Sequence, residues 1–203
     1  MVDLFSPLTG IDISISAATM RQLFHPCTKD FISNICHAKC CESSVAPSGT
    51  LITIHASEQK AIETLGGCVD KSGFLQPRSG ERRCPFKTTN DLCGLHGTTN
   101  KPFGCVASPF TLSRRGCLIV RNRYRLLKCF KAEGAIPVYK AHSGSLFAIF
   151  GNIEGQRLVT HFDNGGGDTS AKINVNTYNM LKDNDVAKKV VGNDKAMETE
   201  NGD

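Results

Sequence analysis

The chain has 203 residues and a formal net charge of +5; 40% of its residues are hydrophobic, ten are cysteine and none is tryptophan. This length fits one domain with appendages, and the small apolar fraction predicts a modest core that gains from a covalent or metal cross-link. No run approaches the ~20 apolar residues of a membrane-spanning helix, and residues 1–20 lack the basic and apolar regions of a signal peptide. We therefore expect a cytoplasmic protein that does not enter a membrane.

Local signals predict short elements in the first third of the chain. Ser16 is placed to cap a short helix over residues 17–24. The β-branched run over 49–55 predicts a strand. Ser57 is placed to cap a two-turn helix over 58–65, which ends at a Gly-Gly pair.

The middle of the chain has little that a conventional core needs. Residues 71–104 are rich in Gly, Pro, Asn, Ser and charge, and they have almost no apolar periodicity. We expect a metal to hold this segment together. Farther along, the pattern over 117–130 fits either a strand or a helix.

Two apolar runs dominate the later part of the chain. The runs over 146–150 and 157–162 flank a glycine-bounded turn, which predicts a β-hairpin. The chain is polar beyond them, and we expect a flexible tail over 164–203 with at most one short helix around 178–191.

Together these elements predict one small, metal-stabilised α+β domain over residues 1–163. It consists of irregular cysteine-rich loops, short helices and a C-terminal β-hairpin, and the flexible tail follows it.

The cysteines form an ordered pattern. It opens with Cys36-His-Ala-Lys-Cys40-Cys41, continues with Cys84-Pro-Phe and Cys93-Gly-Leu-His96, and ends with Pro-Phe-Gly-Cys105. In a reducing compartment, clustered thiols persist as metal ligands or redox groups rather than as structural disulfides. Close ligand groups separated by a long insertion are typical of metal sites, because the metal closes the intervening loop. The candidate ligands are Cys36, Cys40, Cys41, Cys84, Cys93, Cys105 and His96.

In this order the pattern resembles the cysteine-cluster family described as a zinc- or iron-chelating domain, the YkgJ-type family. Its motif runs from a group ending in Cys-Cys, through Cys-Pro-Phe, to a last cysteine ahead of Pro-Phe, and residues 34–112 match it. The resemblance implies binding of zinc or an iron–sulfur cluster, without a single reaction for the family. The commonest version has Cys-x2-Cys-x2-Cys-Cys, and Asn34 and His37 stand at its first two cysteine positions. Cys36 or His37 is then the substitute ligand.

Ligand counting leaves alternatives open. A tetrahedral zinc or a cubane cluster needs four thiolates, and the matched segment offers six. The minimal site uses Cys36, one of the Cys40–Cys41 pair, Cys84, and either Cys93 or Cys105; a binuclear site uses all six together with His96. Iron–sulfur is favoured slightly over zinc, because the loops lack the compact spacing of zinc fingers. The other four cysteines are expected to be ordinary thiols: Cys27, Cys68, Cys117 and Cys129.

A basic stretch follows the cysteine pattern. Residues 112–140 contain eight basic residues and one acid. If 121–125 is a strand, its alternate arginines share one face and can track a phosphate backbone. The candidate nucleic-acid contacts are Arg114, Arg115, Arg121, Arg123, Arg125 and Lys128.

Three functions follow from these patterns. The first is a metal-binding protein, with an iron–sulfur cluster or zinc, that serves an enzyme partner as an accessory or redox component. The second is a structural-zinc module that binds nucleic acid through residues 114–131. The third is a metalloenzyme whose reaction the sequence does not identify.

Overall fold

The centre of the protein is a four-stranded sheet with the strand order β3-β4-β1-β6. The structure is a computed structural model that describes residues 10–45 and 51–182. The strands are β1 (Gly10–Ile15), β3 (Phe110–Leu112), β4 (Cys117–Val120) and β6 (Thr169–Asn174). β1 is parallel to β4 and antiparallel to β6, so the sheet joins both ends of the described chain to its middle.

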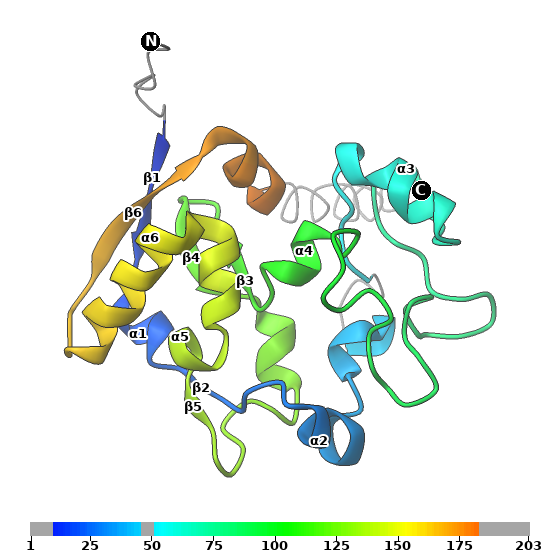
Figure 1. Cartoon of the computed structure of the whole chain (residues 1–203), viewed down its shortest axis with the longest axis horizontal. Coiled ribbons are helices and arrows are strands. Elements are labelled where there is room, and N and C mark those ends of the chain that lie inside the picture. The colour runs from blue at the N-terminus through cyan, green and yellow to red at the C-terminus, as the bar shows by residue number, and fades with distance from the viewer. Residues whose placement is uncertain (1–9, 46–50, 183–203) are drawn as a thin grey trace, which may run out of the picture.

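The main core lies between this sheet and the helices beside it (Figure 1). Alternate side chains of β1 and β6 point inward: Ile13 and Ile15 are each 1% exposed, and on β6 Ala171, opposite Ile13, and Ile173, opposite Ile11, are buried. Burying an aliphatic side chain of this size stabilises a fold by about 1.5–3 kcal/mol. The pairing of β1 with the edge strand β6 is therefore a main source of stability.

Short elements complete this half of the molecule. β2 pairs antiparallel with β5 in a small second sheet. Their bounds, with those of the short helices, are β2 (Leu23–Phe24), β5 (Ile136–Pro137), α1 (Ala17–Met20), α2 (Lys29–Phe31) and α5 (Val138–Ala141).

The predicted β-hairpin over 146–162 is wrong, because this segment is helical. It lies within α6 (Ser143–Asp163), which bends at Gly151, where φ is 79°. A short apolar run fits a buried strand and a buried helix equally well. Buried side chains recur at spacings of three and four residues on each side of Gly151: Leu146, Ile149 and Phe150 before it, and Leu158 and Phe162 after it. Gly151 forms a kink instead of a hairpin turn.

The predicted flexible tail is wrong for residues 169–174, which form β6, whereas the described part of the short helix expected around 178–191 is helical. β6 pairs along six residues with β1, and residues 175–182 are helical, with Leu181 fully buried. The alternation in Thr-Ser-Ala-Lys-Ile-Asn is visible in the sequence, but only the partner strand gives it a role. The rest of the predicted tail, 183–203, lies outside the described residues.

Capping signals near the N-terminus predict the structure better. The Ser16 hydroxyl accepts a hydrogen bond from the Thr19 amide at 3.1 Å and caps α1, which ends earlier than expected. α3 (Ala56–Thr64) is also present, although His55 rather than Ser57 is its N-cap. Of the strand expected over 49–55, the described part forms a single bridge from Thr53 to Phe74, and 46–50 lies outside the described residues.

α3 and the long loops form a second half of the molecule, at the right of Figure 1. Their core is small and separate from the main one. Residues 71–104 contribute Leu75 and Leu95 to it as buried members. The other buried members are Leu51, Ile52, Ile54 and Ile62. The predicted α+β class is confirmed. Among the described helices, none has the length and apolar content needed to cross a membrane.

Candidate functional site

The first cysteine group sits on an unusual backbone. α2 continues into a π-helix (Ile32–Cys36), and His37 and Ala38 then adopt left-handed φ values of 51° and 43°. A short 3-10 helix (Lys39–Cys41) follows. π-helical turns are rare and often occur at functional sites, and left-handed non-glycine residues store strain of about 1–3 kcal/mol each. The surrounding contacts must hold this turn in place.

The loop that carries Cys84 and Cys93 is hydrogen-bonded directly to the first cysteine group. The Cys84 amide donates a hydrogen bond to the Cys41 carbonyl at 2.9 Å. Lys87 forms a β-bridge with Cys93, and the Gly94 amide donates to the Phe86 carbonyl at 2.8 Å. This loop therefore places Cys84 and Cys93 near the backbone that carries Cys41.

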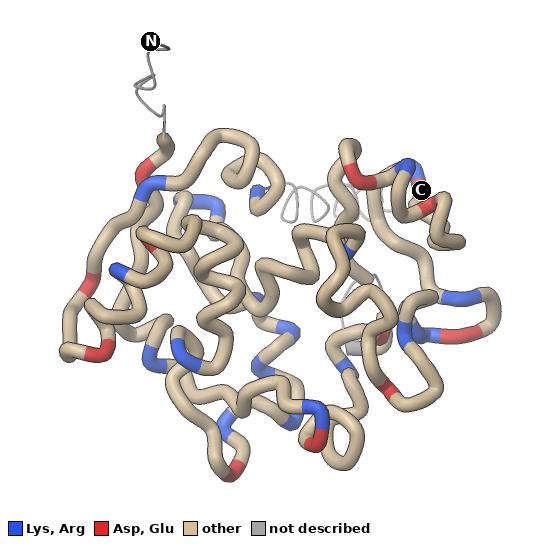
Figure 2. The backbone as a smooth tube through the Cα atoms, viewed as in Figure 1, with Lys and Arg blue, Asp and Glu red and all other residues tan. Residues whose placement is uncertain are grey.

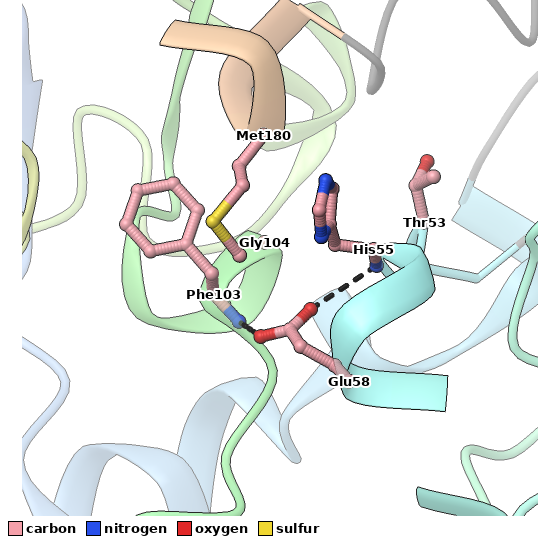
Figure 3. Close-up of a pocket in the computed structure, with 6 residues that line it drawn as sticks. All are labelled: Thr53, His55, Glu58, Phe103, Gly104 and Met180. Carbon is pink, nitrogen blue, oxygen red and sulfur yellow. Dashed lines mark hydrogen bonds between the residues drawn. The ribbon is translucent and has the colours of Figure 1, made fainter. Parts of the chain in front are cut away.

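The last cysteine is positioned by α3. Cys105 lies on α4 (Phe103–Val106). The Glu58 carboxylate accepts hydrogen bonds from the amides of Phe103 at 2.6 Å and His55 at 3.1 Å, so it joins the starts of two helices (Figure 3). A side chain at Gly104 would lie 2.9 Å from Ile52, so glycine allows α4 to approach the second core closely.

Four cysteines lie around this junction, near enough that charge on Cys41, Cys84 or Cys93 would raise the pKa of Cys105. We call them the thiol cluster: Cys41, Cys84, Cys93 and Cys105. Burial raises the pKa of Cys105, and negative charge on the other three would raise it further. Burial likewise raises the pKa of Cys84 to about 12, with contributions from Cys41 and Cys93. Without a metal, the Cys84 and Cys105 thiols are therefore protonated at neutral pH.

The cluster is gathered without the geometry of a metal shell. Within residues 10–45 and 51–182, no group of three or more His, Cys, Asp or Glu side chains is arranged to hold a metal ion. Cys40 lies next to the cluster, with its Sγ 3.9 Å from that of Cys41. A hydrogen bond between these two thiols is the main cause that raises the pKa of Cys41.

Two predicted ligands lie elsewhere. Cys36 is buried in the main core. Burial raises the pKa of Cys129 to about 12, with further contributions from Cys27 and Cys36, so these three thiols are neighbours. His96 is exposed, and its Nδ1 atom lies 3.4 Å from the Lys101 ammonium.

A buried lysine holds the two cysteine groups together, and the sequence pattern did not reveal it. The Lys87 side chain is 1% exposed. Its ammonium donates to the His37 carbonyl at 2.6 Å and forms ion pairs with Glu42 at 2.9 Å and Asp91 at 3.0 Å. Burial opposes ionisation of Glu42, but hydrogen bonds from Lys39 and Lys87 lower its pKa overall. The network joins the strained turn to the loop between Cys84 and Cys93.

The basic stretch is divided between interior and surface. The segment 117–130, which fits either a strand or a helix in sequence, contains both: β4 ends at Val120, and residues Asn122–Leu126 form a 3-10 helix. The condition that 121–125 is a strand is therefore not met. Arg121 and Arg123 bond to backbone carbonyls inside the protein. The other four candidate contacts are exposed: Arg114, Arg115, Arg125 and Lys128. Figure 2 shows lysine and arginine spread over many segments of the described chain.

Two polar residues that position the cysteines, Lys87 and Glu58, were not recognised from the sequence, although each has an identifiable local position. Lys87 directly follows Cys-Pro-Phe, and Glu58 stands three residues after His55, where a capping box places it. The capping box was readable from the sequence, but the link from Glu58 to α4 was not.

Comparison of the chain with protein-family models, with curated proteins and with solved structures finds no match. The resemblance to the YkgJ-type family stays a prediction.

Proposed function

We propose that the protein binds a metal centre, either zinc or an iron–sulfur cluster, through the thiol cluster, and serves another enzyme as an accessory or redox component. The observation that carries the proposal is the meeting of four thiols from three segments that are far apart in the sequence. Each segment has its own fixing contact: Arg123 at Cys41, the bridge at Cys93, and Glu58 at the helix of Cys105.

The donor set fits such a centre. Four thiolates are the usual ligands of structural zinc and of iron–sulfur clusters, and soft sulfur donors favour these metals over calcium or magnesium. The apolar residues packed beside Cys84, Cys93 and Cys105 limit the access of water. When bound, zinc would supply a structural cross-link, and a cluster would supply electron transfer.

The small second core gives a physical reason for a metal. Residues 71–104 bury few apolar side chains, and a structural metal contributes its binding free energy to folding. Binding would draw the gathered sulfurs into a regular shell and would stabilise the loops that carry them.

Anaerobic purification followed by elemental analysis and visible absorption tests the proposal. We expect bound zinc, or iron with sulfide and a brown colour, in the parent protein. Cys84→Ser and Cys93→Ser should each lose the metal, whereas the exposed Cys68→Ser should keep it. Equal metal content in all four proteins, or none in the parent after reconstitution with either metal, would refute the proposal.

The other two candidate functions remain predictions. The nucleic-acid module now rests on four exposed basic side chains, because Arg121 and Arg123 are engaged within the protein. Salt-dependent binding of DNA or RNA that is lost in Arg114→Gln and Arg115→Gln would favour it. A metalloenzyme would require an open coordination position on the metal.

A further inference from the structure

We infer that Arg121 and Arg123 are the counter-cations of the thiol cluster: each guanidinium holds the backbone beside one ligand cysteine and balances part of the negative charge of the metal-bound thiolates. A divalent metal held by four thiolates carries two net negative charges, and the two arginines supply two positive ones. The inference rests on the proposed function, because metal binding is what deprotonates the four sulfurs.

Arg123 donates hydrogen bonds to the backbone on both sides of Cys41. One terminal nitrogen of its guanidinium donates to the carbonyls of Cys40 at 3.0 Å and Glu42 at 3.1 Å, which are the residues directly before and after Cys41. The other terminal nitrogen donates to the Leu51 carbonyl at 3.1 Å. Positive charge on Arg123 also favours the thiolate form of Cys41 and so opposes the rise of its pKa.

Arg121 has the same relation to Cys105. It contacts the carbonyl of Gly104, the preceding residue, at 3.5 Å. Burial lowers the pKa of Arg121, and negative charge on Cys105 would raise it. The two arginines thus lie beside two different cysteines of the thiol cluster.

Neither arginine has a carboxylate partner in the described part of the chain. The Nε atoms of both are buried, and neither donates a hydrogen bond to a described residue. Glu42 already binds two lysines. Burial raises the pKa of Tyr124, which lies close to both arginines, so its phenol is neutral and supplies no charge. Both side chains are partly buried, and a charge withdrawn from water without an opposite charge is unfavourable. The thiol cluster is the neighbour that metal binding makes anionic.

Cobalt titration of the reduced, metal-free protein tests the inference, because thiolate-bound Co²⁺ gives a charge-transfer band. Loss of a group that supports metal ligands typically lowers affinity about 10- to 100-fold. We expect a loss of this size in Arg121→Met and Arg123→Met and a smaller loss in Arg121→Lys, which retains the charge. Arg125→Met is the matched control, because Arg125 is exposed and its hydrogen bond is to the side chain of Gln22. This variant should bind Co²⁺ like the parent.

The thermal stability of the metal-free protein separates a charge role from a structural one. Arg121→Met removes an uncompensated cation and one long contact, so the metal-free melting temperature should stay the same or rise while Co²⁺ affinity falls. Affinity like that of the parent, or equal losses in the Met and Lys variants, would overturn the inference and leave the proposed function intact. A parent that binds no Co²⁺ through thiolates would overturn both. If Arg123→Met does not fold, Arg121→Met and Arg121→Lys decide alone.

Discussion

Replacement of Lys87 by methionine is the sharpest test of how the cysteine groups are held together. Methionine keeps the length of the side chain but removes the ammonium that binds the His37 carbonyl, Glu42 and Asp91. Glu42 then keeps Lys39, whose side chain is 50% exposed, as its ion-pair partner. Removing one partner of a buried ion pair typically costs about 3–5 kcal/mol, which is a large part of the total stability of about 5–15 kcal/mol expected for a domain.

Urea unfolding of the parent, Lys87→Met and Lys87→Met/Glu42→Gln measures this cost. We expect the single variant to lose about 3–5 kcal/mol, and the double variant to recover part of it because Glu42 no longer carries a buried charge. Lys39→Met, which removes the more exposed partner, should lose about 1 kcal/mol or less. A similarly small loss for Lys87→Met would show that water compensates Glu42 and Asp91 and that the reasoning from burial is wrong.

Three further predictions concern the sheet, the helix junction and pH. Deletion of residues 169–203 should abolish the cooperative thermal transition. It removes the antiparallel partner of β1 and three buried aliphatic side chains, Ala171, Ile173 and Leu181, whose burial contributes about 5 kcal/mol. An unchanged melting curve would mean that β6 contributes little. Glu58→Gln should lower the free energy of unfolding by about 1–3 kcal/mol and speed alkylation of Cys105 in the metal-free protein. An unaltered alkylation rate would argue against positioning of α4 by this carboxylate. Burial raises the pKa of the Cys84 thiol to about 12 in the folded, metal-free protein, whereas the unfolded chain releases this proton near pH 9. The contribution of Cys84 to stability should therefore be constant below pH 9 and fall between these two values; a rise in urea midpoint over this interval would contradict the burial of Cys84. Metal affinity should show the opposite trend and increase with pH, because binding displaces protons.

The elements predicted correctly depend on neighbours in the sequence. Ser16 caps α1 through a residue three positions away, and the helix after His55 is fixed by its own capping box. Such signals need no knowledge of the fold. The spacing of Cys41, Cys84, Cys93 and Cys105 also indicated that they lie near one another, whereas their binding of a metal stays a prediction.

The errors arose where tertiary contacts decide the structure. β6 has a polar sequence outside its two inward positions, and its pairing with β1 gives those positions a core to enter. Arg121 and Arg123 alternate in sequence like residues on one strand face, but the 3-10 helix turns them toward carbonyls that lie far away in the chain. Composition identifies such residues as basic, and only the fold shows which way they point.

The strand order also has a consequence for how the protein is made. Every member of the thiol cluster precedes β4 and β6 in the chain, whereas β1, which precedes them all, pairs with both of these later strands. A chain emerging from the ribosome therefore completes its thiol loops while β1 still has no partner, and distant pairings of this kind form slowly. Metal present during translation meets these loops before the sheet forms, whereas metal added to the finished protein meets cysteines that are already partly buried. Loading during synthesis should accordingly be faster and more complete than reconstitution afterwards.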